Sequence, residues 1–345
     1  MNSIEIGVIL RKKEQYVTTV TIDGIGKIKM TKTAVLVATY NGEKILQKQL
    51  DTIREQELKP DFVLFRDDRS TDNTVAFLKD YIAKYNLENW IIKINDVNIG
   101  WRLNFRQLLV DTLNYDIDIA FFSDQDNIWH LDKNLRQVRV MEEHPEMELL
   151  SADIEVKKVS EDVADLPRWF TYFKFEQNQE FSKYPLRFGY SSYRVGWVVG
   201  MRRKFIADIV KYWKPEYNIT HDVLVAALSS LTETGYNLNH VVGTHLLHDS
   251  NATGDRLLTV HSPKQVHVDE LYKFVGFYDV MYHVLQERGS NHAPRVKAYY
   301  DFYVKRHSMA RDNKFWSVLM QIVKDWNYYD GMSGRLRDIL FAFKR

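Results

Sequence analysis

The sequence places two carboxylates two residues apart, in the segment Asp124-Gln125-Asp126. They follow the apolar run 117–122, which is typical of a buried strand. Oxygen ligands at a strand end can be presented to one hard cation, and Mg²⁺ or Mn²⁺ prefers such ligands and commonly bridges to phosphates. The pattern predicts metal ligands at Asp124 and Asp126. Taken by itself, it fits a solvated turn with helix-capping acids as well.

A second acidic pair, Asp67 and Asp68, follows the apolar run 62–65. A carboxylate in this place can accept a hydrogen bond from the N–H of a base or from a ribose hydroxyl. The alternative is an Asx-turn that caps the next helix. Asn98 and Gly100 stand after a third strand-like run and could contact a sugar or ribose, or could form a turn and a helix cap.

Two further candidates lie downstream. His221 and Asp222 open a predicted helix, whose N-terminus favours an ionised carboxylate, as a general base requires. The alternative is a simple helix cap. His248 follows a predicted strand over 240–247 and could be a third metal ligand, although a single histidine is more often structural.

These residues are expected to meet because the chain alternates strand and helix from residue 33. Apolar runs at 34–38, 62–65, 90–94 and 117–122 predict buried strands, and helically spaced apolar residues lie between them. Such alternation predicts an α/β fold with a mainly parallel sheet covered by helices on both faces. In an open parallel sheet, ligands bind beyond the carboxyl ends of the strands, where the polar sets above fall.

The flanking segments differ from this pattern. Residues 1–32 predict a β-rich N-terminal appendage, and residues 261–345 predict a helical C-terminal extension. Between them, 33–260 is expected to form one domain, in which strands and helices alternate regularly to about residue 130 and less regularly after it. The tail combines aromatic and basic residues, which favours either a peripheral membrane contact or packing against the 33–260 domain or a homodimer partner.

Composition narrows the class of protein. The 345 residues carry a net charge of +1, which argues against a broad electrostatic nucleic-acid binder, and the absence of cysteine excludes disulfides and thiol catalysis. The N-terminus does not resemble a signal peptide, and no apolar run approaches the ~20 residues of a membrane span. We therefore expect a cytoplasmic protein, with a peripheral place at the inner face of the cell membrane as a further hypothesis. There is no G-x-G-x-x-G, P-loop or G-x-S-x-G motif.

Four segments resemble one known family. They are A-T-Y-N-G-E at 38–43, R-D-D-R-S-T-D-N-T at 66–74, N-I-G at 98–100 and S-D-Q-D-N-I-W at 123–129. In this order and spacing they are similar to the inverting family 2 glycosyltransferases, and in particular to the bacterial rhamnosyltransferase-like subgroup. The resemblance is strong over 33–135 and weaker to about 255. It implies a GT-A fold with a Rossmann-like nucleotide-binding half (33–130) and an acceptor half (131–260).

The resemblance also implies residue roles. Asp68 would hold a uracil or thymine ring, Asp126 would be the principal metal ligand, and Asp222 would be the catalytic base. The nucleotide pocket would include Ala38, Thr39, Tyr40, Asn41, Asp67, Asp68, Asn98, Gly100 and Asp124. Gly196, Trp197 and His221 would line the acceptor and sugar pocket, and Asp124, Asp126 and His248 would hold Mn²⁺ or Mg²⁺.

The chain departs from the subgroup pattern at three places. Arg69 stands where Gly is usual, Asn127 stands where Asp is usual, and the Arg that often precedes the histidine at 248 is missing. The first departure affects the turn near the base, and the others affect the expected metal site.

The implied function is transfer of a sugar from a UDP- or dTDP-linked donor to a hydroxyl of a glycan, glycolipid or glycoprotein, with inversion. The setting would be the synthesis of bacterial cell-surface glycans or the glycosylation of adhesins. One alternative is a sugar-phosphate nucleotidyltransferase, which predicts a Gly-rich basic loop where T-Y-N-G-E-K follows the first strand. The other is a non-catalytic scaffold subunit of a glycosylation complex.

Overall fold

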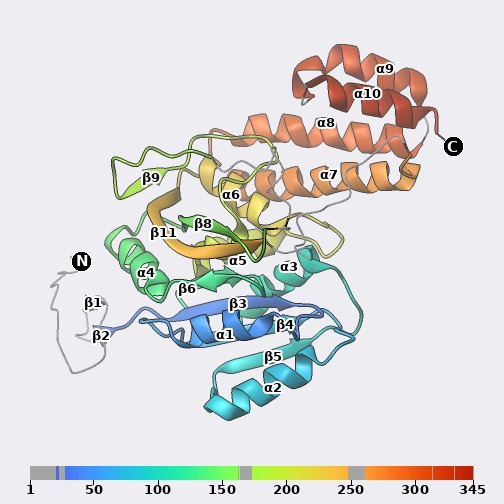
Figure 1. Ribbon diagram of the computed structural model, residues 1–345. Helices are drawn as coiled ribbons and strands as arrows, with labels where there is room; N and C mark the ends of the chain where they lie inside the picture. The colour runs from blue at the N-terminus through green and yellow to red at the C-terminus, as the bar shows by residue number, and fades with distance from the viewer. Residues whose placement is uncertain are drawn as a thin grey trace. The chain divides into compact units, whose positions relative to one another are not determined.

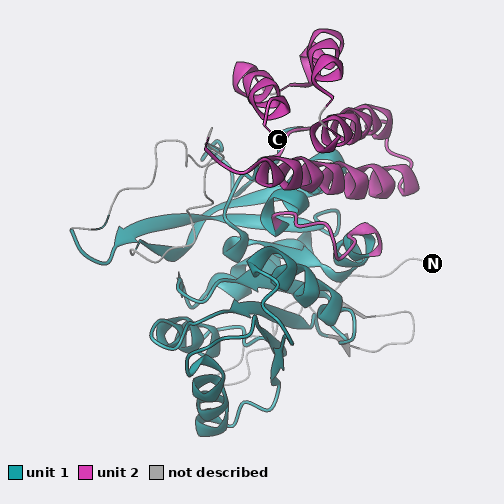
Figure 2. Ribbon diagram, turned by 90° about the vertical axis from the view of Figure 1, so that its right-hand side faces the viewer, with its two compact units in different colours: residues 1–187, 191–210, 221–249 teal, residues 188–190, 211–220, 250–345 magenta. Residues whose placement is uncertain are grey.

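The computed structural model describes residues 21–22, 28–161, 163, 173–247, 261–312, 314–329 and 331–344. The chain divides into two compact units, coloured separately in Figure 2. The first contains residues 1–187, 191–210 and 221–249, and the second contains 188–190, 211–220 and 250–345. Because no observation tests the domain boundaries expected from the sequence, those boundaries stay a prediction.

The first unit is built on a nine-stranded sheet in the order β5-β4-β3-β6-β10-β8-β11-β7, with β9 paired to β11 (Figure 1). The strands are β3 (Thr33–Thr39), β4 (Phe62–Asp67), β5 (Trp90–Ile94), β6 (Ile119–Ser123), β7 (Ile128–Trp129), β8 (Leu149–Lys158), β9 (Phe181–Lys183), β10 (Gly200–Arg202) and β11 (Gly235–Leu247).

The four strands expected from apolar runs form the parallel half of this sheet. β3 pairs in parallel with β4 and β6, and β4 pairs in parallel with β5. The register sets Thr39 beside Asp67 and Val37 beside Ser123, so the carboxyl ends of β3, β4 and β6 adjoin. The predicted α/β class is confirmed, and the strand ends that carry the polar sets share one edge.

The other half of the sheet is mixed rather than parallel. β10 runs antiparallel between β6 and β8, and β11 is parallel to β8 but antiparallel to β7 and β9. β10 has three residues and β7 has two, which is too short for any periodicity to appear in the sequence.

Helices connect these strands, and each buries mainly one side except α6, which is buried almost all round. They are α1 (Leu46–Arg54), α2 (Thr74–Tyr85), α3 (Trp101–Thr112), α4 (Lys133–Glu143), α5 (Arg203–Tyr212) and α6 (His221–Leu231). The chain moves outward from β3 to β5 and then returns past β4 and β3 to β6. With right-handed crossovers, this reversal places α3 on the face opposite α1 and α2. The helices therefore cover both faces of the parallel half.

The second unit contains α7 (Lys264–Glu287), α8 (Ala293–Arg311), α9 (Phe315–Lys324) and α10 (Gly331–Ala342). A buried ion pair joins α8 to α10, with Arg306 Nε 2.8 Å from Asp338 Oδ2 and Nη2 2.8 Å from Oδ1. Among the described residues, none of the helices is both long enough and apolar enough to span a membrane. In the predicted N-terminal appendage, the structure describes two paired strands of two residues each, β1 (Thr21–Ile22) and β2 (Ile28–Lys29). Most of 1–32 lies outside the described residues.

Candidate active site

The edge formed by the strand ends is tied together by side chains that bond to backbone. Gln125 joins the end of β6 to the end of β3, because its Oε1 accepts the N–H of Tyr40 at 3.0 Å and its Nε2 donates to the Tyr40 carbonyl at 3.1 Å. A Cβ on Gly42 would lie 2.5 Å from the same Oε1. A larger residue at this position would therefore displace the Gln125 amide from its bonds to Tyr40.

Asp67 holds the ends of β3 and β4 together and is fully buried. It accepts the hydroxyl of Thr39 at 3.0 Å and the backbone N–H of Ser70 at 2.8 Å. The Ser70 hydroxyl in turn lies 2.9 Å from the backbone nitrogen of Asn41. Ala38, Thr39 and Asn41 are therefore placed at this edge, while the Tyr40 side chain is exposed.

Asp68 is buried and lies at the centre of the loop that begins α3. Its Oδ1 accepts Asn95 Nδ2 at 2.9 Å and the N–H of Ile99 at 2.8 Å, and its Oδ2 accepts the N–H of Gly100 at 2.8 Å. Asn98 donates from Nδ2 to the Asp68 carbonyl. A carboxylate has about four acceptor positions. These bonds use three of them, two on Oδ1 and one on Oδ2.

The pair Asp124 and Asp126 lies just past β6, and Asn127 bridges it. Asn127 donates from Nδ2 to Asp126 Oδ1 at 3.2 Å and at a longer 3.4 Å to Asp124 Oδ2. Its Oδ1 lies 2.8 Å from Nδ1 of His245, on β11. Burial, together with the neighbouring charges of Asp126 and then Asp222, raises the pKa of Asp124. Asp222, from a distant part of the chain, thus lies near enough to Asp124 to affect its pKa.

Asp222 lies in the first turn of α6. Part of its surface is accessible, but its carboxyl is deep enough that lost hydration raises its pKa to about 6. The backbone N–H groups of Val223 and Gly196 and the charge of Arg102 act in the opposite direction. Val223 donates to Oδ1 at 2.8 Å. The carboxylate is therefore oriented by backbone and mostly ionised at neutral pH.

His221 precedes Asp222 at the start of α6, and its ring packs among aromatic side chains. Its ring stacks on Phe105 at 3.9 Å and meets the edge of Phe122 at 4.6 Å between centroids. Burial, and secondarily Arg102, lowers its pKa to about 3, so the ring is neutral. Its two nitrogens have no hydrogen-bond partner within the described part of the chain. A Cβ on Gly196 would lie 2.5 Å from His221 Nε2, so these two elements are in direct contact.

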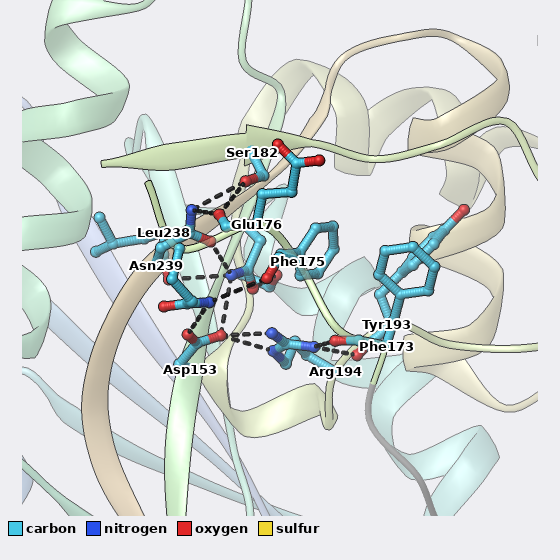
Figure 3. Close-up of polar contacts among 12 residues, drawn as sticks. Asp153, Phe173, Phe175, Glu176, Ser182, Tyr193, Arg194, Leu238 and Asn239 are labelled. Carbon is cyan, nitrogen blue, oxygen red and sulfur yellow. Dashed lines mark hydrogen bonds and ion pairs between the residues drawn. The ribbon is translucent and has the colours of Figure 1, made fainter. Parts of the chain in front are cut away.

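Gly196 and Trp197 form the short helix η1 (Gly196–Val198), and Trp197 is fully buried in the core of the sheet. The segment leading into η1 is fixed by an ion pair that Figure 3 shows in detail. Arg194 donates from Nε to Asp153 Oδ1 at 3.0 Å and from Nη1 to the Phe173 carbonyl at 2.6 Å. Asn237, on β11, also donates to Asp153, at 3.0 Å. This anchor sets where Gly196 meets Asp222.

A comparison with family models decides the membership of the chain. The model described as glycosyl transferase family 2 matches residues 34–210, just over half of the chain. The chain belongs to glycosyl transferase family 2. The family predicted from the four motifs is confirmed, and so is the prediction of a transferase.

Individual relatives agree with this family 2 membership. The dTDP-rhamnosyl transferase RfbG of Shigella flexneri is 37% identical over 98 residues, which span 28% of this chain and 34% of that protein. The structure of S. aureus TarS 1–349 in complex with UDP matches with a TM-score of 0.53 at 19% identity, covering 91% of this chain and 81% of that one. GalNAc-T7 with UDP, GalNAc and Mn²⁺ matches with a TM-score of 0.50 at 9% identity, covering 80% and 58%. The structural matches confirm the predicted fold.

The carboxylates of this family 2 chain suit a hard divalent cation, although the set is small. Within the described ranges, no three histidine or acidic side chains are arranged to hold a metal ion. His248, the predicted third ligand, lies outside those ranges. Asp124 and Asp126 together offer oxygen ligands, and a cation between them would offset the negative charge of Asp126 that helps to raise the pKa of Asp124. Mg²⁺ is often held by one or two carboxylates plus phosphate and water, so two residues fit such an ion.

Two residues of the site, Arg102 and His245, were not among the sequence candidates. Arg102 influences the pKa values of both Asp222 and His221, and His245 bonds to Asn127. Arg102 follows the N-I-G motif by two residues, so the motif could have pointed to it. His245 required knowing that β11 lies beside β7.

Proposed function

We propose that this protein transfers a sugar from a UDP- or dTDP-linked donor to a hydroxyl of a glycan, glycolipid or glycoprotein, with inversion at the anomeric carbon. The observation that carries the proposal is that the charges of Asp126 and of Asp222, in the first turn of α6, both act on Asp124, which follows the carboxyl end of β6. It is supported by the partial match to a dTDP-rhamnosyl transferase and by the fold shared with a UDP complex of TarS. The proposed setting is the synthesis of bacterial surface glycans or adhesin glycosylation, in the cytoplasm at the inner face of the membrane.

In this mechanism Asp222 is the general base. Its carboxylate takes the proton of the acceptor hydroxyl while that oxygen bonds to the anomeric carbon on the face opposite the nucleotide. The bond from that carbon to the diphosphate oxygen breaks, and the nucleoside diphosphate leaves with the electron pair. The transition state has oxocarbenium character, as in glycoside hydrolysis. The N–H groups of Val223 and Gly196 aim the carboxylate, and its pKa of about 6 leaves it ready to accept a proton near neutral pH.

The donor nucleotide is proposed to lie along the strand ends that Asp67 and Gln125 hold together. The Asp68 carboxylate, which has three internal donors, is proposed to accept a ring N–H as a fourth, and uracil and thymine both present one. Asn98 and Gly100, which bond to Asp68, would shape the same pocket. This arrangement favours a pyrimidine donor without distinguishing UDP from dTDP.

We further infer that Mn²⁺ or Mg²⁺ assists the reaction, held by Asp124 and Asp126, with His248 as the predicted third ligand. When bound, such an ion neutralises the charge that builds on the leaving diphosphate. Asn127 would keep the two carboxylates in position through its bonds to both. The Mn²⁺ in the GalNAc-T7 structure supports this inference by fold analogy.

The deciding experiment compares the wild type with Asp222→Asn in a screen of UDP- and dTDP-sugars with Mn²⁺. A positioned base contributes ~10²–10⁴-fold, so turnover should fall by about that factor while calorimetry shows unchanged donor binding. Asp132→Asn, which changes a carboxylate at the start of α4, is the matched control and should keep full activity.

The products separate the competing functions. A glycosyltransferase releases a nucleoside diphosphate, and NMR of the product should show the inverted anomer. Release of pyrophosphate would instead identify a sugar-phosphate nucleotidyltransferase, and absence of both transfer and donor hydrolysis would identify a scaffold. Wild-type turnover in Asp222→Asn would remove Asp222 from the role of base.

A further inference from the structure

The last two helices of the second unit expose apolar side chains in regular stripes. On α9, Trp316, Met320 and Val323 recur at intervals of four and three residues and are 76%, 73% and 79% exposed. On α10 and just beyond it, the stripe consists of Met332, Leu336, Leu340 and Phe343, exposed by 56%, 54%, 48% and 68%. We call these seven residues the apolar hairpin face.

The residues of the apolar hairpin face are not the ones that these helices bury in the core of the second unit. The opposite sides of the same helices are buried, through Val318 and Ile322 on α9 and Phe341 on α10. The two helices pack against each other, and the rings of Phe315 and Phe343 approach to 4.3 Å. Of the ten large hydrophobic residues described as more than half exposed, six belong to this face. Clustered exposed apolar residues of this kind mark an interaction surface.

The exposed charges on these two helices have one sign. Three basic side chains are exposed, those of Lys314, Lys324 and Arg337. The Nζ atom of Lys314 lies 3.3 Å from Oδ2 of Asp312. The hairpin's acid Asp338 is buried and bound to Arg306, and Asp325 is half-buried. The exposed charged side chains described over 314–344 are therefore basic. This favours a negatively charged partner.

We propose that the apolar hairpin face docks on an anionic phospholipid surface. Amphipathic helices with Trp, Phe and Leu on one side and Lys or Arg beside them lie in the interfacial region of such membranes. Tryptophan is favoured there because its ring combines an apolar body with an N–H donor. A second copy of the chain fits less well, because a two-fold interface through this face would bring the basic residues of both copies together.

Vesicle co-sedimentation of the full chain tests the proposal. Binding to phosphatidylcholine vesicles with 30% phosphatidylserine should exceed binding to pure phosphatidylcholine by at least about tenfold and should weaken with salt. A variant with Trp316→Ser, Met320→Ser and Val323→Ser should lose this binding. These residues are exposed, so the change leaves the fold intact. A control with Val159→Ser and Leu186→Ser alters two apolar residues outside the hairpin that are 56% and 52% exposed, and it should bind as the wild type does.

Two results would overturn the proposal. One is wild-type chain that stays in the supernatant with both vesicle types. The other is a dimer in light scattering that the triple variant dissociates, without any vesicle binding, which would assign the face to a second copy. Because the triple variant leaves the carboxylates of the first unit untouched, transfer to a water-soluble acceptor should persist in it. Failure of membrane docking is thus distinguishable from failure of the proposed sugar transfer.

Discussion

At the level of single residues, the pKa of Asp222 is set by a balance between burial and nearby donors. Burial raises this pKa, and the backbone N–H groups of Val223 and Gly196 and the charge of Arg102 lower it. A base must be ionised before it can accept a proton. The pH at which activity begins therefore reports on this balance.

The pH dependence of kcat/KM should show an acidic limb near pH 6, below which Asp222 is protonated and transfer stops. Arg102 favours the ionised carboxylate, so removing its charge raises the pKa of Asp222. Arg102→Gln should therefore move the limb to higher pH, and Arg102→Lys, which keeps a positive charge, should move it less. A limb that stays in place in Arg102→Gln would show that the base is another group.

Gly196 is the second residue whose replacement should change activity. A Cβ there would lie 2.5 Å from Nε2 of His221, whose ring cannot retreat between Phe105 and Phe122. Gly196→Ala should shift the base and lower kcat by at least about tenfold, with donor affinity little changed. Gly189→Ala is the matched control, since a Cβ at Gly189 meets nothing within 4 Å. Equal kcat values for the two variants would contradict the proposed contact.

Much of the site could be predicted from strand ends alone. The polar sets after β3, β4 and β6 meet because parallel strands end at a common edge, and that rule placed Thr39, Asp67 and Asp124 together. The same rule could not show that three internal donors occupy most of Asp68. Nor could it place Asp222 beside Asp124, because that contact depends on how α6 returns to the sheet.

At the level of elements, the parallel half was predictable and the mixed half was not. Buried strands of five to seven residues leave a clear apolar run, as β3 and β6 do. β11 is longer than the predicted strand 240–247 because it begins at Gly235, and register shifts interrupt its pairing with β8 at Val241. Such irregularities break the alternation that would otherwise mark a strand.

The ion pair between Arg194 and Asp153, which fixes the segment leading into η1, gives a prediction about stability. Arg194 is buried with Asp153, and its removal leaves a largely buried carboxylate without its cation. Arg194→Met should lower the free energy of unfolding by about 3–5 kcal/mol in denaturant titrations. The control Arg139→Met breaks an exposed pair with Glu143 and should cost less than about 1 kcal/mol. Equal costs for the two variants would mean that Asp153 is held by Asn237 and Gln177 alone.

At the level of the whole molecule, the division into two compact units predicts two thermal transitions. Burial opposes ionisation of Asp338, but His267 and Arg306 outweigh it and hold its pKa below the usual value. Its stabilising effect is therefore present above about pH 4 and is lost as the pH falls through the lowered pKa. Asp338→Asn should remove that effect at neutral pH and leave Arg306 buried without its partner, at a cost of about 3–5 kcal/mol to the second unit.

Scanning calorimetry should then distinguish the two units, because different treatments should shift the temperature of each transition. A nucleoside diphosphate at about 100 times its Kd, with Mn²⁺, adds about 2.7 kcal/mol to the free energy of unfolding of the unit that binds it. It should therefore raise the transition temperature of the first unit only. Asp338→Asn should lower only the other transition, by more than about 10 °C. If both treatments shift a single common transition, the chain unfolds as one cooperative body. In that case the carboxylate site depends for its stability on the helices that carry the apolar hairpin face.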